Sequence, residues 1–283
     1  MSAKSTSLKA KLRNMAEEKK LSSQVLLQNY MFERFLERLS MSEYRDKFVV
    51  KGGMLIAAIV GVATRSTMDL DVSVKAYPLD AGHIKSAIEE ICSVDVVDGV
   101  FFNLERIGQI RLDNEYGGIR ASLKAVYDSI VTHLSVDITS GDVITPSVVR
   151  YGFKTLFDEN NKITLWAYNI ETILAEKVET ILRRGTFNSR SRDFYDVYIL
   201  VRTQAFSLDI FQQALKATAE RRATTELIRD IGSILKDIES SNDLKSLWIK
   251  YQNEYHYAED VTYEDTVSAL RKLLDNTNGD LVI

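Results

Sequence analysis

The residues best suited to chemistry lie between residues 51 and 74, in the stretch KGGMLIAAIVGVATRSTMDLDVSV. Its last seven residues alternate between apolar and polar, which predicts a half-buried strand. Asp69, Asp71 and Ser73 then share one face of the strand. The core side of the strand holds Met68, Leu70, Val72 and Val74. Two adjacent carboxylates repel each other, so their pairing favours a bound divalent cation, with a solvated strand face as the structural alternative.

The start of the same stretch predicts a site for phosphates. Lys51, Gly52 and Gly53 open an apolar run with helical character. Glycine has no Cβ and lets the backbone approach a ligand closely. The first turn of a helix also directs free N–H groups at an anion. Phosphates held by backbone and a metal held by carboxylates are therefore expected, with Arg65 and Thr67 lying between the two groups.

A third carboxylate occurs on a later predicted strand at residues 130–138. Its alternation places His133, Ser135 and Asp137 on one face and the apolar residues on the other. Asp137 is therefore a strand carboxylate on a polar face, and beside Asp69 and Asp71 we favour it as a third metal ligand. The structural alternative is a solvated aspartate close to the turn that follows the strand.

A second group of charged residues lies in the helical part of the chain. Lys177 interrupts the apolar stripe of a helix predicted at 170–184, where it either extends its charge past the core or holds nucleotide phosphates. Asp193 and Asp196 are three residues apart and share a helix face. Four arginines either pair with these acids or form a basic strip for an RNA backbone: Arg183, Arg184, Arg190 and Arg192.

The composition is that of an ordinary globular protein. The chain has 283 residues, a net charge of −4 and a single cysteine, Cys92, which excludes an internal disulfide and a cysteine-rich zinc site. We expect no secretory signal, no membrane span and a cytoplasmic location. The pattern predicts an α+β fold, with a mixed-sheet domain at 1–160 and a helical domain at 161–283.

The order of these motifs resembles the AbiEii/AbiGii family of abortive-infection nucleotidyltransferases, over roughly residues 8–202. These are toxins of type IV toxin–antitoxin systems, and the mycobacterial MenT toxins are relatives. The motifs that carry the resemblance are Lys51-Gly52-Gly53, Arg65-x-Thr67-x-Asp69-x-Asp71, Asp137-Ile138-Thr139-x-Gly141-Asp142, Ala175-Glu176-Lys177 and Arg192-Asp193-x-x-Asp196.

The resemblance implies a nucleotidyltransferase-like domain joined to a helical domain, with the active site in the cleft between them. It implies Mg²⁺-dependent transfer of a nucleotidyl group from a nucleoside triphosphate to an RNA acceptor, the 3′ end of tRNA. It also implies a cognate antitoxin that acts without a stable complex. By position, Asp69 and Asp71 match the metal-binding pair, and Lys177 and Asp193 match residues required for toxicity. The expected nucleotide-binding residues are Lys51, Gly52, Gly53, Arg65, Ser66, Thr67, Lys177 and Asp196. Ser66, or the equally close Thr67, matches a modifiable position in relatives.

Three other functions fit parts of the pattern. An antibiotic-type nucleotidyltransferase has the same Gly-Gly and Asp-x-Asp core but a small hydroxylated acceptor. A non-catalytic module would bind nucleotide or a partner without transferring anything. A metal-dependent nuclease or phosphohydrolase would use the carboxylates but would leave the lysine and the helical half without a role.

Overall fold

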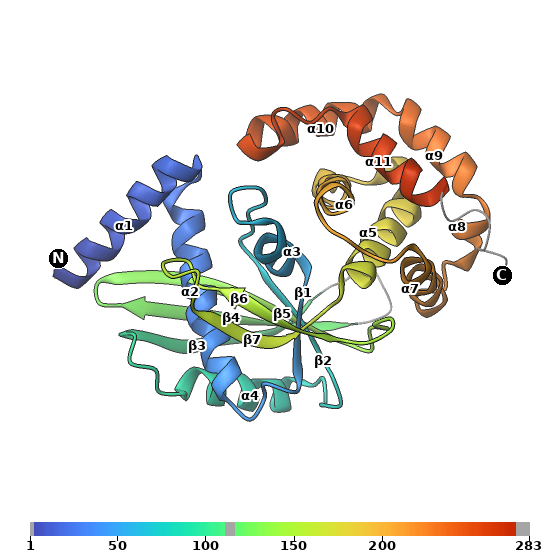
Figure 1. Cartoon of the computed structure of the whole chain (residues 1–283). Helices are drawn as coiled ribbons and strands as arrows, with labels where there is room; N and C mark the ends of the chain where they lie inside the picture. The colour runs from blue at the N-terminus through green and yellow to red at the C-terminus, as the bar shows by residue number, and fades with distance from the viewer. Residues whose placement is uncertain (1–2, 111–116, 276–283) are drawn as a thin grey trace. The chain divides into compact units, whose positions relative to one another are not determined.

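A computed structural model describes residues 3–110 and 117–275 of the chain. The chain divides into two compact units, and each is described by itself (Figure 1). The first unit comprises Met1–Gly141 and Val149–Ala167, and the second comprises Asp142–Val148 and Tyr168–Ile283. Residue 160, predicted as a domain boundary, lies inside the first unit, because the chain returns to the sheet after residue 148.

The first unit is built on a seven-stranded mixed sheet with the order β3-β4-β5-β2-β1-β7-β6. Pairs β2–β5 and β1–β7 are parallel, and the others are antiparallel. The strands are β1 (Phe48–Lys51), β2 (Leu70–Val74), β3 (Val100–Ile110), β4 (Gly118–Tyr127), β5 (Ile130–Ser140), β6 (Val149–Lys154) and β7 (Lys162–Ala167). The hairpin β6–β7 adds to the sheet beside β1, which is why residues 149–167 belong to this unit.

Four helices accompany the sheet: α1 (Ala3–Lys19), α2 (Ser23–Met41), α3 (Gly52–Val60) and α4 (Ala81–Ser93). Helix α2 begins where the Ser22 hydroxyl accepts a hydrogen bond from the Val25 N–H group at 3.1 Å. Its apolar side is buried, and Arg38 on that side forms a buried ion pair with Asp98 at 2.8 Å. The same guanidinium donates to the Val100 carbonyl at 2.6 Å, which fixes α2 to the start of β3.

The second unit is helical, so the predicted α+β class is confirmed. Its elements are α5 (Ile170–Arg184), η1 (Gly185–Phe187), α6 (Ser191–Thr203), α7 (Leu208–Arg221), α8 (Thr225–Arg229), α9 (Ile231–Ser240), α10 (Asn242–Glu254), η2 (His256–Ala258) and α11 (Tyr263–Asp275). Helix α5 starts at Asn169, whose side chain accepts from the Thr172 N–H group at 2.7 Å and donates to the Thr145 carbonyl at 2.6 Å. None of the helices described is long and apolar enough to cross a membrane.

Candidate active site

A row of charged residues crosses four strands of the sheet. Lys51 on β1 pairs in register with Asp71 on β2, Asp71 pairs with Asp137 on β5, and Asp137 pairs with Arg120 on β4. Residues directly opposite one another on neighbouring strands share a face of the sheet. The two carboxylates therefore lie side by side between two cations of the protein. Asp69 directly precedes β2 at the same end of the strand.

Asp137 is held by an arginine that the sequence analysis does not single out. Arg120 donates from Nε to one carboxylate oxygen and from Nη2 to the other, both at 2.6 Å. The paired carboxylate raises the pKa of Arg120, although burial opposes the shift. Both oxygens of Asp137 are thus already engaged by a two-pronged contact. The alternation of β4 gave no signal for Arg120, because exposed arginines on strands are common.

Asp69 and Asp71 offer the oxygen ligands that Mg²⁺ prefers. Among residues 3–110 and 117–275, no group of three or more His, Cys, Asp and Glu side chains is arranged to hold a metal ion. A nucleotide-bound Mg²⁺ fits such a pair nevertheless, because this ion is commonly held by one or two carboxylates together with substrate phosphates and water. The third ligand role expected for Asp137 stays a prediction, and Arg120 would have to release a carboxylate oxygen for it.

The two glycines at the start of α3 are required by the protein's own packing. Gly52 has a φ of +65°, and a Cβ on it would lie 2.1 Å from Asp71 Oδ2. A Cβ on Gly53 would lie 2.6 Å from an Arg65 guanidinium nitrogen and 2.8 Å from Thr67 Oγ1. The sequence analysis expected these glycines to let a ligand approach the backbone closely. In the structure, the groups that approach the backbone here are the Asp71 carboxylate and Arg65.

We expect Gly52→Ala to abolish nucleotide transfer and to destabilise the protein more than Gly185→Ala. Both positions have positive φ, +65° and +50°, a backbone conformation in which alanine is strained. Nothing lies within 4 Å of a Cβ on Gly185, so only Gly52→Ala also displaces the Asp71 carboxylate. Urea unfolding and transfer assays on both variants measure the difference. Equal stability of the two variants would contradict this account of Gly52.

The link between α3 and β2 differs from its prediction at Arg65 and Met68, and β2 itself differs at Ser73. Arg65 is only 3% exposed, and its Nη1 donates to the Ser66 carbonyl at 2.9 Å. This burial behind Gly53 leaves its guanidinium little surface for the triphosphate that it was expected to contact. Met68, expected on the core side, is 41% exposed because β2 starts only at Leu70. Ser73, expected on the polar face, is buried.

Two amide side chains of α2 hold this link in place. Gln28 donates to the Met68 carbonyl at 2.8 Å, and Asn29 donates to the Thr67 carbonyl at 3.2 Å. Thr67 Oγ1 also lies 3.4 Å from the backbone nitrogen of Asp69. The backbone on the N-terminal side of Asp69 is thereby fixed to a buried helix. A sequence signal existed for these residues, because amides on the apolar side of a helix need buried partners.

We expect Gln28→Leu to lower the rate of nucleotide transfer while keeping the fold. The lost hydrogen bond is worth about 0.5–1.5 kcal/mol and frees the backbone next to Asp69. Gln24→Leu is the matched control, because Gln24 is exposed one turn earlier on the same helix. Steady-state kinetics and thermal melts of both variants make the comparison. If both transfer at the wild-type rate, Gln28 does not position Asp69.

In the second unit, Lys177 binds both aspartates of α6. Its Nζ lies 2.7 Å from Asp193 Oδ1 and 2.9 Å from Asp196 Oδ2. The lysine side chain is 17% exposed and those of Asp193 and Asp196 are 3% and 0% exposed. The buried Oδ2 of Asp193 has no hydrogen-bond partner among the described residues. This group is an ammonium at the edge of the core held by two buried carboxylates, rather than a lysine extended into solvent.

The arginines of the second unit differ in their pairing and exposure. Arg183 Nε lies 3.3 Å from Glu179 Oε1, and Glu179, which is 2% exposed, also pairs with Arg222. Arg222 further contacts Glu176 at 3.2 Å, which joins α5 to the residue after α7. Arg190 and Arg192 are exposed. Arg183 thus pairs with an acid within the unit, which was the structural alternative, but its partner is Glu179.

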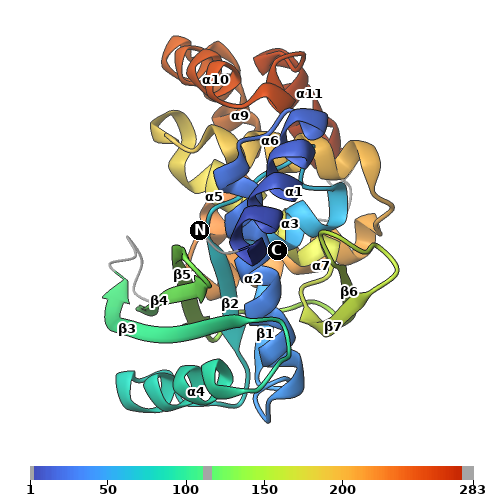
Figure 2. The same cartoon turned by 90° about the vertical axis from the view of Figure 1, so that its left-hand side faces the viewer.

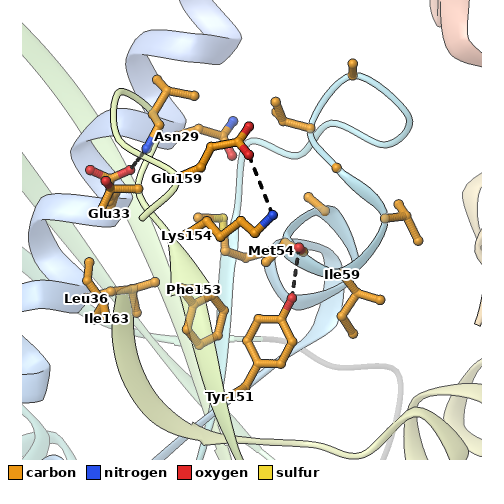
Figure 3. Close-up of a pocket in the computed structure, with 18 of the residues that line it drawn as sticks. Asn29, Glu33, Leu36, Met54, Ile59, Tyr151, Phe153, Lys154, Glu159 and Ile163 are labelled. Atoms are coloured by element: carbon orange, nitrogen blue, oxygen red, sulfur yellow. Dashed lines mark hydrogen bonds and ion pairs between the residues drawn. The ribbon is translucent and has the colours of Figure 1, made fainter. Parts of the chain in front are cut away.

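A cavity of about 440 Å³ lies at the other end of α3 in the first unit (Figure 3). Tyr151 donates to the Ala58 carbonyl at 2.9 Å on one side, and Lys154 pairs with Glu159 at 3.6 Å on the other. The cavity is lined by Met54 and residues 57–60 of α3, but not by Gly52, Asp69 or Asp71. The cavity is therefore distinct from the group of carboxylates at the N-terminal end of α3.

Comparison with known proteins agrees with this arrangement. The chain matches the family described as "Nucleotidyl transferase AbiEii toxin, Type IV TA system" over residues 34–276. The chain belongs to the AbiEii family. Membership confirms the resemblance based on the motifs and makes the protein a nucleotidyltransferase of a toxin family. No curated protein matches this AbiEii chain.

Solved structures similar to this AbiEii protein include two from Helicobacter pylori. One is described as a candidate nucleotidyltransferase, with 17% identity, a TM-score of 0.50, and coverage of 92% of this chain and 98% of its own. The other, JHP933, has 16% identity, a TM-score of 0.48 and coverage of 92% and 95%. At such identities the first neighbour shows the fold alone, which confirms the nucleotidyltransferase-like architecture.

Proposed function

We propose that this AbiEii protein transfers a nucleoside monophosphate from a nucleoside triphosphate to an RNA acceptor, the 3′ end of tRNA, with Mg²⁺. The observation that supports the proposal most is the pairing of Asp71 with Asp137 beside the start of α3. Carboxylates for a metal and a helix N-terminus for phosphates occur together at one end of β2.

Each group has a proposed role in an in-line displacement at the α-phosphorus. Asp69 and Asp71 would hold Mg²⁺, which would supply positive charge to neutralise the phosphates and lower the pKa of the acceptor hydroxyl. The side chain of the N-cap residue Lys51 does not cap α3, and N–H groups of a helix start are suited to the leaving pyrophosphate. The acceptor oxygen bonds to the α-phosphorus as the bond to the bridging oxygen breaks, and the hydroxyl proton passes to water.

We also propose that Lys177 and Asp193 of the second unit are required for transfer. The ammonium is rigidly held by two buried carboxylates, as a charge-stabilising group should be. The family also suggests an antitoxin, which we propose acts without forming a stable complex with the protein.

Mass spectrometry of total RNA after incubation with each nucleoside triphosphate and Mg²⁺ tests the proposal. The expected result is a mass increase of one nucleotide on tRNA with one preferred triphosphate. A parallel incubation with aminoglycosides tests the small-molecule acceptor. Labelled aminoglycoside without labelled RNA would overturn the RNA assignment, and tight nucleotide binding with no pyrophosphate release would overturn catalysis.

A further inference from the structure

The row that contains Asp137 is the first of four rows on one open face of the sheet. Strands β3, β4 and β5 run side by side (Figure 2) and continue beyond the point where β2 begins. Their other face is buried, with Ala121, Leu123 and Leu134 at most 2% exposed. Side chains on the open face are exposed or half-buried.

The register fixes what each further row presents. The second row holds Arg106, Ser122 and Ser135, and the third holds Asn103, Lys124 and His133. The fourth row holds Phe101, Val126 and Val131. Successive rows on one face are two residues apart along a strand, which is about 6.8 Å. Phe101, in the fourth row, therefore lies about 20 Å from the first row, which contains Asp137.

The side chains of these rows are available to a ligand. Phe101 is 69% exposed, and Asn103 and Arg106 are also exposed. Arg106 and Lys124 form no hydrogen bond or ion pair with any residue that the structure describes. His133 contacts Glu105 at 3.0 Å, so this acid already has a partner. Two unpaired cations, small polar side chains and an aromatic ring thus follow one another away from the carboxylates.

We propose that this face, defined as Phe101, Asn103, Arg106, Ser122, Lys124 and Ser135, binds the single-stranded 3′ segment of the RNA acceptor. Open sheets with exposed aromatic rings and basic residues are suited to single-stranded RNA, because bases stack on rings while cations meet phosphates. Hydroxyl and amide groups can contact ribose 2′-hydroxyls. The last nucleotide then lies at the Asp71–Asp137 row and earlier nucleotides lie toward Phe101. This inference rests on the proposed transfer to RNA.

The test measures how transfer depends on acceptor length. Single-stranded RNAs of about two to about eight nucleotides serve as acceptors, together with the full chain and labelled nucleoside triphosphate. We expect KM to fall at least about tenfold with length in the wild type. Lys124→Ala and Phe101→Leu should make KM fall less with acceptor length. Both variants should leave transfer to the shortest acceptor unchanged. Phe101→Tyr should retain the wild-type dependence of KM on acceptor length, because its ring can still stack on a base.

Lys162→Ala is the matched control, since Lys162 is an exposed lysine of β7 outside this face. Lys124→Ala should also reduce the salt dependence of RNA binding by about one counterion, and Lys162→Ala should not. The same length dependence in wild type, Lys124→Ala and Phe101→Leu would overturn the inference. Absence of labelling with every acceptor would instead overturn the proposed function, and fluorescence anisotropy with RNA alone would still test the face.

Discussion

Replacing Asp71 by asparagine is expected to reduce nucleotide transfer by about 10³-fold or more while leaving the fold intact. Asparagine keeps the shape of the side chain that packs against Gly52. It removes the negative charge that would bind the metal ion of a metal–triphosphate complex. Transfer kinetics across a Mg²⁺ titration and a urea unfolding curve measure the two effects separately.

Two further variants sharpen this test. Asp95→Asn is the control, because Asp95 is an exposed aspartate of the same unit away from β2. Asp137→Asn should cost less activity than Asp71→Asn if Arg120 remains its principal partner. Wild-type transfer by Asp71→Asn would remove the metal site from this position. Equal losses for Asp71→Asn and Asp137→Asn would indicate that Arg120 releases the carboxylate during the reaction.

Replacing Lys177 by methionine is expected to damage both stability and activity. The variant leaves Asp193 and Asp196 buried without their common cation, and breaking a buried pair in this way costs about 3–5 kcal/mol. Urea unfolding of the full chain measures that cost, with fluorescence and circular dichroism recorded together because the two units need not unfold in one step.

A triple variant separates structure from catalysis in this group. Lys177→Met combined with Asp193→Asn and Asp196→Asn removes the unpaired charges and should recover most of the lost stability. Transfer should remain absent, because the ammonium is still missing. Recovery of both stability and transfer in the triple variant would show that Lys177 serves only to neutralise the aspartates.

The sequence predicted which strand faces carry the carboxylates of the site, but not the residue that pairs with Asp137 on the neighbouring strand. Alternation alone places Asp71 and Asp137 on polar faces, and the two strands pair in register because the sheet order brings β5 beside β2. That pairing joins residues far apart in the chain, so no local pattern contains it. The same pairing explains why Arg120 was overlooked, since only the partner strand gives it a role.

Arg65 shows that a motif in the sequence does not reveal whether its side chains are exposed. Its position between Gly-Gly and Asp-x-Asp suits a phosphate contact, yet its side chain is buried behind Gly53. Burial depends on which segments close over a residue, and here Gly53 makes room for the guanidinium. Lys177 shows a different limit. The sequence singled out this lysine and the two acids of one helix face, but it expected arginines as the partners of the acids, whereas the structure pairs both acids with Lys177.

The excursion of residues 142–148 into the second unit has a practical consequence for dissecting the protein. The chain passes between the units at three places, after Gly141, after Val148 and after Ala167. Truncation at any one of them deprives one unit of a segment, so recombinant halves made that way should fold poorly. A fragment of the sheet unit would need a short artificial loop joining Gly141 to Val149, and the helical unit would need residues 142–148 supplied as a linked or added peptide.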